Sequence, residues 1–200
     1  MSSPIPSTPP SDEMLRDHRG NLRARADIGL SYGQARLGLA FHEAAHAVVG
    51  LSVGTRVLTS EVIAWSPGPG MWTVTGNTAQ EWRGAPGWEF ATVAAAGEQA
   101  HVEYLWRYGL WTPGRAADCA ADHDRELAID TLAEHGLSLG RDSTPPGGRS
   151  WAAIQRLARR TVKDLWPAIR TVAFAVDQHT RLTGTDITDL LGPLLRGGAA

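Results

Sequence analysis

LGLAFHEAAHAVVG, residues 37–50, is the stretch that decides how this 200-residue chain folds. Apolar side chains recur in it at the spacing of an α-helix that is buried against other elements. Ser31 and Gln34 precede it in the S-x-x-Q pattern of a capping box, which marks the start of a helix. The sequence therefore predicts a buried helix over residues 33–51.

The same stretch carries the pentapeptide His42-Glu43-Ala44-Ala45-His46. Two histidines four residues apart lie on one face of a helix, and the glutamate follows the first of them. Two imidazole ligands with a neighbouring carboxylate are what a zinc-bound water needs in order to lose its proton. The pattern predicts a zinc site with His42 and His46 as ligands and Glu43 as the base. The alternative is two inert histidines on a partly buried helix.

Catalytic zinc usually takes a third protein ligand, and helix phase helps to choose it. On a helix predicted over residues 122–135, Asp124 shares its face with apolar residues four and eight positions further on. Asp122 shares its face with acids, which favours solvent exposure and a role as the N-cap. Asp124 is the predicted third ligand, and Asp122 and Glu98 remain alternatives. The downstream candidates together are Glu98, His101, Glu103, Cys119, Asp122, His123 and Asp124.

The rest of the chain predicts an α+β fold that is predominantly α-helical. Two β-rich segments flank a Pro-Gly turn at residues 66–70 and predict a small antiparallel sheet over about residues 55–76. Trp111-Thr112-Pro113-Gly114 is predicted as a loop, and residues 140–149 as a flexible connector. Further helices are predicted over residues 85–108 and 122–135, from Ser150 with a kink or a new start at Pro167, and over residues 185–192.

Length and composition indicate one domain over residues 31–192, with a disordered or weakly structured tail over residues 1–30 and a flexible tail over residues 193–200.

The net charge of −2 gives no reason to expect nucleic acid or an anionic membrane as a partner. With Cys119 as the single cysteine, no internal disulfide forms, so a cytoplasmic location is expected. No apolar stretch reaches the ~18 residues of a membrane span, and the first residues lack the apolar centre of a secretory signal.

Several segments, in their order along the chain, resemble the peptidase domain of the membrane-anchored AAA proteases, the M41 metallopeptidase family. FHEAAHAVVG resembles the zinc helix of that family, which usually has glycine at the position of Ala45. EVIAWSPGPGMWTVTGNT is similar to its strand, Pro-Gly turn and strand, and VAAAGEQAHVE to its Ala-Gly-rich helix. CAADHDRELAIDTLAE resembles the segment with the third ligand, and RLTGTDITDLL the closing signature. The resemblance covers about residues 30–192.

The resemblance implies a zinc-dependent endopeptidase with a mainly helical fold and a polypeptide substrate. It implies His42, His46 and Asp124 as zinc ligands and Glu43 as the base; Asp124 follows His46 by 124 − 46 = 78 residues, a separation like that of the family. The sequence contains no G-x-x-x-x-G-K-[ST] phosphate loop, so we expect hydrolysis of unstructured or partner polypeptides without ATP-driven unfolding. A homo-oligomer or a partner ATPase is compatible with that expectation.

Two other functions are open from the sequence. The chain could be a non-proteolytic interaction or regulatory module that keeps a structural zinc site, or a zinc hydrolase that processes one particular peptide. For a peptidase, the sheet edge around residues 71–75 is expected to pair with an extended peptide. Trp65 and Trp72 are candidates to line that groove, and burial in the core is the more common alternative for tryptophan.

Several single residues carry weaker expectations. Glu98 orients a ligating histidine or pairs with an arginine. Cys119 is expected to be a buried structural side chain. Surface positions are expected for His101, His123 and His135.

Overall fold

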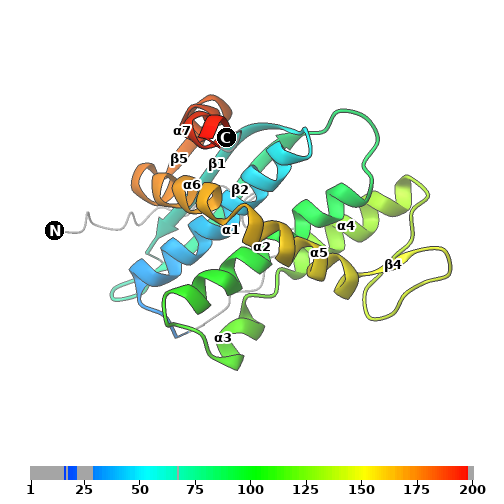
Figure 1. Cartoon of the computed structure of the whole chain (residues 1–200). Coiled ribbons are helices and arrows are strands. Elements are labelled where there is room, and N and C mark those ends of the chain that lie inside the picture. The colour runs from blue at the N-terminus through cyan, green and yellow to red at the C-terminus, as the bar shows by residue number, and fades with distance from the viewer. Residues whose placement is uncertain (1–15, 17, 22–28, 67, 198–200) are drawn as a thin grey trace.

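The structure is a computed structural model that describes residues 16, 18–21, 29–66 and 68–197, without the side chains of residues 193–197. The predicted fold class is confirmed, since helices predominate and the main sheet is small and antiparallel (Figure 1). No helix among the described residues combines the length and the apolar character needed to cross a membrane. The helices are α1 Tyr32–Ser52, α2 Trp88–Arg107, α3 Pro113–Asp118, α4 Asp122–Glu134, α5 Trp151–Asp164, α6 Trp166–His179 and α7 Gly184–Gly197. The strands are β1 Arg56–Trp65, β2 Thr73–Glu81, β3 Leu139–Gly140, β4 Arg149–Ser150 and β5 Arg181–Thr183.

Helix α1 is the central element, and it packs against α2, α6 and the β1–β2 hairpin. The predicted capping box is present, because the Ser31 hydroxyl accepts from the Gln34 backbone N–H and the Gln34 side chain accepts from the Ser31 backbone N–H. Every residue from Ala40 to Gly50 is buried. The polar residues of the HEAAH pentapeptide are therefore held inside the protein rather than at its surface.

The main sheet contains one strand more than the sequence predicted. β1 and β2 form the predicted antiparallel hairpin, although β2 continues to Glu81 instead of ending near residue 76. The third strand, β5, pairs with β1 over only three residues, and the strand order is β2-β1-β5. A strand of three residues carries too little periodicity to be recognised in a sequence.

Helix α2 joins the two parts of the core. On one side it packs against α1, within a cluster that includes α6 and α7, and on the other it packs against α4 and α5 (Figure 1). Small residues such as Ala95, Ala96 and Ala100 are fully buried on α2, and they allow this close approach. This arrangement brings the start of α4 toward the middle of α1.

Several element boundaries differ from the predicted ones. The predicted loop at residues 111–114 leads into the short helix α3, because the Thr112 hydroxyl accepts from the Arg115 backbone and a proline stands in the first turn. Ser150 caps α5 as predicted, and Pro167 lies in the first turn of a new helix, α6. Helix α7 continues to Gly197, beyond the predicted end at residue 192.

The ends of the chain are described only in part. Of the predicted N-terminal tail, the described residues include His18 and Arg19, whose side chains contact the Asp130 carboxylate on α4. Residues 1–15, 17 and 22–28 of this tail lie outside the described residues, as do residues 198–200 of the predicted C-terminal tail.

Candidate metal centre

Three side chains converge between α1 and the first turn of α4. Nε2 of His42 lies 2.9 Å from Nε2 of His46, and these two nitrogens lie 3.2 and 3.4 Å from Oδ2 of Asp124. Among the described residues, these three side chains form a group of potential metal ligands whose ligand atoms all lie within 4.8 Å of one another. Ala128 and Leu132 are buried on the same side of α4 as Asp124, which is the helix phase that the sequence predicted.

The spacing of the three ligand atoms fits a tetrahedral zinc site. Zinc bonds of about 2.0–2.2 Å to nitrogen and oxygen put neighbouring ligand atoms about 3.3–3.6 Å apart in a tetrahedron. The observed separations of 2.9 to 3.4 Å come close to this range. Two imidazoles and one carboxylate are also a ligand set that zinc enzymes use while keeping one position open.

Asp124 provides an independent sign that a cation belongs here. Its Oδ2 is buried, and no hydrogen bond of ordinary geometry reaches it, since its polar neighbours are the two imidazole nitrogens at 3.2 and 3.4 Å; such burial is costly for a carboxylate oxygen. Burial disfavours the charged form of His46, but the Asp124 carboxylate outweighs burial and raises the pKa of His46 to about 9. Burial would raise the pKa of Asp124, yet the charges of His46 and His123 lower it well below its usual range. Positive charge is therefore favoured between the three side chains.

Gly97 of α2 keeps the space beside the two histidines open. A Cβ atom at Gly97 would lie 2.5 Å from Nε2 of His42 and 2.5 Å from Nε2 of His46. A side chain at this position would thus collide with both imidazoles and displace them from their convergent positions. Sequence reasoning missed this residue; the signal was a glycine inside an alanine-rich helix, which costs helix stability unless close packing requires it.

Two further contacts orient the predicted ligands. Nδ1 of His46 lies 2.8 Å from the backbone oxygen of Val93, which can only accept a hydrogen bond. The proton of a neutral His46 therefore belongs on Nδ1, and Nε2 keeps its lone pair for a metal. Nε2 of His123 lies 3.1 Å from Oδ1 of Asp124. The side chain of His123 is partly exposed, at 32%. His123 was one of the candidate third ligands, with a surface position as the expectation, and the structure places it beside the ligand Asp124 instead of among the converging atoms.

Glu43, the predicted base, is buried between α1 and β2. Its Oε2 accepts a hydrogen bond of 2.8 Å from the Thr78 hydroxyl. A Cβ atom at Gly76 would lie 2.5 Å from Oε1 of Glu43, so the glycine lets the strand approach the carboxylate. Neither Gly76 nor Thr78 could be identified from sequence, because each lies more than 30 positions after Glu43 in the chain.

The alternative third ligands lie elsewhere. Asp122 is exposed and pairs with Arg125 at 3.0 Å, and its predicted role as the N-cap is wrong, because Ala121 holds that position. Asp122 is the first residue of α4, and its carboxylate pairs with the side chain of Arg125 in the same turn of the helix. Glu98 was expected to orient a histidine or to pair with an arginine; instead it accepts hydrogen bonds from the Gln155 side chain and the Ala121 backbone. Glu98 thus fixes the turn that precedes α4, and burial raises its pKa.

One surface expectation was wrong, and one of the two candidate groove residues belongs to the core. His101 is buried rather than at the surface; its Nε2 has no hydrogen-bond partner, and burial lowers its pKa to about 3. Trp65 is 3% exposed and belongs to the core, so it lines no groove, whereas Trp72 is 36% exposed and contacts the ring of Tyr32. Cys119 is buried as predicted, and burial raises its pKa to about 12.

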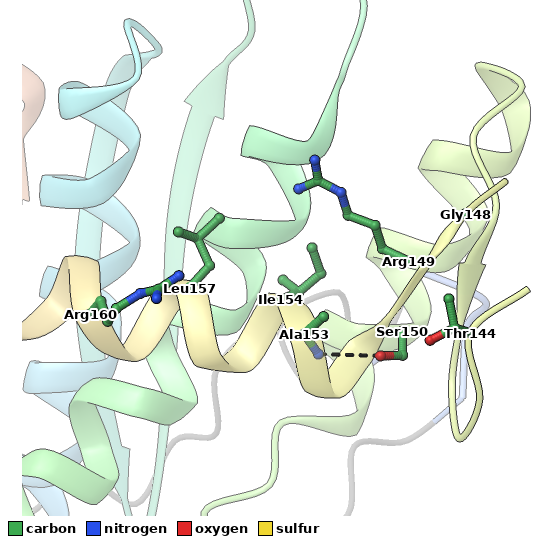
Figure 2. Close-up of a pocket in the computed structure, with 8 residues that line it drawn as sticks. All are labelled: Thr144, Gly148, Arg149, Ser150, Ala153, Ile154, Leu157 and Arg160. Atoms are coloured by element: carbon green, nitrogen blue, oxygen red, sulfur yellow. Dashed lines mark hydrogen bonds between the residues drawn. The ribbon is translucent and has the colours of Figure 1, made fainter.

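The described cavities lie away from this centre. One, of about 330 Å³, opens beside the start of α5, where Figure 2 shows the Ser150 hydroxyl bonded to the Ala153 backbone. That hydroxyl therefore serves as the helix cap. A second cavity, of about 560 Å³, lies at α6, β5 and α7. The first is lined by Thr144, Gly148, Arg149, Ser150, Ala153, Ile154, Leu157 and Arg160.

Comparison with protein-family models and with curated protein sequences gives no match for this chain. The candidate metal centre therefore stands on the geometry of its own residues, and the M41 resemblance remains a hypothesis.

Proposed function

We propose that this chain is a zinc-dependent metallopeptidase in which His42, His46 and Asp124 hold the metal and Glu43 is the general base. The observation that carries the proposal is the convergence of three ligand atoms within 3.4 Å, beside a carboxylate on the same helix. Gly97 supports it, because the glycine lets α2 pack closely against the two imidazoles without displacing them from their convergent positions.

Held by His42, His46 and Asp124, a zinc ion would supply a Lewis acid that polarises a scissile carbonyl and lowers the pKa of a bound water molecule. Glu43 accepts the proton of the attacking water and passes it to the leaving amine. The Thr78 hydroxyl holds Oε2 of Glu43, so the carboxylate keeps its orientation during both proton transfers. In a neutral His46, the Val93 carbonyl accepts from Nδ1–H and so favours the tautomer that leaves Nε2 free for a metal.

The position of β2 supports a polypeptide substrate. This strand lies at the edge of the sheet, and its Thr78 contacts Glu43. Extended peptides bind to sheet edges through main-chain hydrogen bonds, with side chains recognised by neighbouring surfaces. Met71 and Trp72, which are 57% and 36% exposed just before β2, offer an apolar surface for such side chains.

The direct test is hydrolysis of unstructured casein and of a mixed peptide library by the zinc-loaded protein, without ATP. Glu43→Gln should lower the rate by at least ~100-fold, the size of a general-base contribution, while the zinc content stays unchanged. A chelator should stop the reaction, and added zinc should restore it. Wild-type rates in Glu43→Gln would contradict the role of Glu43.

One observation favours a second candidate, a non-proteolytic module with a structural zinc. His42, Glu43, His46 and Asp124 are at most 9% exposed, whereas a catalytic zinc site must admit water and substrate to an open coordination position. A hydroxamate separates the two functions, because it binds zinc only where a coordination position is open. Hydroxamate binding that requires bound zinc would support the peptidase; zinc binding without hydroxamate binding would support the structural module.

A further inference from the structure

The two oxygens of the Asp124 carboxylate have different neighbours. Oδ2 faces the imidazoles of His42 and His46, at 3.2 and 3.4 Å. Oδ1 lies 3.1 Å from Nε2 of His123, within hydrogen-bonding distance. The buried carboxylate is thus held between two ring nitrogens on its inner side and one on its outer side.

A contact between residues 123 and 124 needs an explanation, because neighbouring residues on a helix point about 100° apart. Both residues lie in the first turn of α4, and the imidazole of His123 is nevertheless turned so that its Nε2 lies 3.1 Å from the carboxylate oxygen Oδ1. The terminal torsion of aspartate is broad and roughly two-fold, so its own rotamer does not choose which oxygen faces inward. A donor on one oxygen does make that choice.

We propose that His123 is a positioning residue, whose Nε2–H donates to Oδ1 of Asp124 and thereby directs Oδ2 at the metal. This inference rests on the proposed function, because it requires a metal at the candidate centre. His123 touches neither the two ligating histidines nor Glu43 in the described contacts, so its effect passes through Asp124. Partners of this kind typically change metal affinity by about 10–100-fold.

The test is a comparison of zinc affinities, measured by competition with a chromophoric chelator. His123→Leu keeps the bulk of the side chain but removes the donor, and it should weaken zinc binding by about 10–100-fold. His123→Gln carries an amide N–H about as far from the backbone as Nε2, and it should recover most of the affinity. His135→Leu is the matched control, since His135 is exposed at the other end of α4, where its Nδ1 lies 2.9 Å from the Thr131 backbone oxygen.

Circular dichroism of each apo variant checks that the fold is retained. Wild-type affinity in His123→Leu, or equal weakening in His123→Leu and His123→Gln, would overturn the positioning role. Those outcomes leave the metal centre intact, because the wild type still binds zinc. A wild type that binds no zinc would instead overturn the proposed function, and with it this inference.

Discussion

Helices α1 and α2 both carry buried histidines, but only the pair on α1 contacts a carboxylate. His42 and His46 on α1 converge with the Asp124 carboxylate, and the Val93 carbonyl orients His46. His101 on α2 is equally buried, yet its Nε2 has no hydrogen-bond partner. Correspondingly, the pKa of His46 is raised to about 9, whereas burial lowers that of His101 to about 3.

The difference shows what distinguishes a candidate metal site from a histidine in a core. Burial alone pushes an imidazole toward its neutral form and offers it nothing to bind. Convergence with a carboxylate, in a space that Gly97 keeps clear, creates a place for a cation.

Loss of the carboxylate should have the largest effect. Asp124→Ala should weaken zinc binding by more than ~100-fold, because losing a ligand should cost more affinity than losing a residue that only orients a ligand, which costs about 10–100-fold. Asp122→Ala is the matched control, because Asp122 is an exposed acid on the same helical turn. Isothermal titration of zinc into both apo proteins measures the difference. Equal affinities would remove Asp124 from the centre and reopen the choice of third ligand.

Filling the space at Gly97 should have the next largest effect, although every ligand remains. Gly97→Ala puts a methyl group 2.5 Å from both imidazole nitrogens, so zinc affinity should fall by at least ~10-fold. Gly33→Ala, on a helical glycine with open space around it, should keep the affinity. It should also stabilise α1 by about 0.5–1 kcal/mol. A Gly97→Ala protein with wild-type zinc affinity would contradict the proposed location of the ion.

Metal removal should lower stability only through the HEAAH centre. Free zinc at about 100 times its dissociation constant adds about 2.7 kcal/mol to the free energy of unfolding. Thermal unfolding with zinc and with a chelator should therefore give different midpoints for the wild type. Asp124→Ala should give nearly the same midpoint in both conditions. A zinc-dependent midpoint in that variant would point to a second site.

The smallest effect is expected at the other histidine. Because Nε2 of His101 is buried without a partner, His101→Leu removes an unsatisfied polar atom and should change the free energy of unfolding by no more than ~1 kcal/mol, or raise it. Zinc affinity should be unchanged. Urea unfolding together with the zinc titration measures both quantities, and a loss of zinc binding would assign His101 a role at the centre.

The sequence predicted the parts of this molecule that depend on local spacing. The capping box at Ser31, the shared face of His42 and His46, and the inward phase of Asp124 all follow from the geometry of a single helix. The start of a new helix at Pro167 was one of two predicted outcomes. Each of these features needs only residues within a few turns of one another.

The parts that the sequence did not predict depend on contacts between elements. Gly97 matters only because α2 crosses the histidines of α1, and Thr78 only because β2 approaches Glu43. Strand β5 is identified by its pairing with β1, about 120 residues earlier in the chain. Asp122 was assigned to the N-cap by residue type, but α4 begins at Asp122 itself and Ala121 is the N-cap. The Asp122 side chain therefore pairs with Arg125 instead.

The most direct test of the central claim is the X-ray absorption spectrum of the zinc-loaded protein at the zinc edge. A centre formed by His42, His46 and Asp124 predicts two imidazole nitrogens together with oxygen ligands, all at about 2.0–2.2 Å from the zinc, and no sulfur ligand. Asp124→Ala should lose an oxygen ligand or the metal itself. A sulfur shell at about 2.3 Å, which only Cys119 or a methionine of this chain could supply, or a shell without two imidazoles, would contradict the assignment of His42, His46 and Asp124.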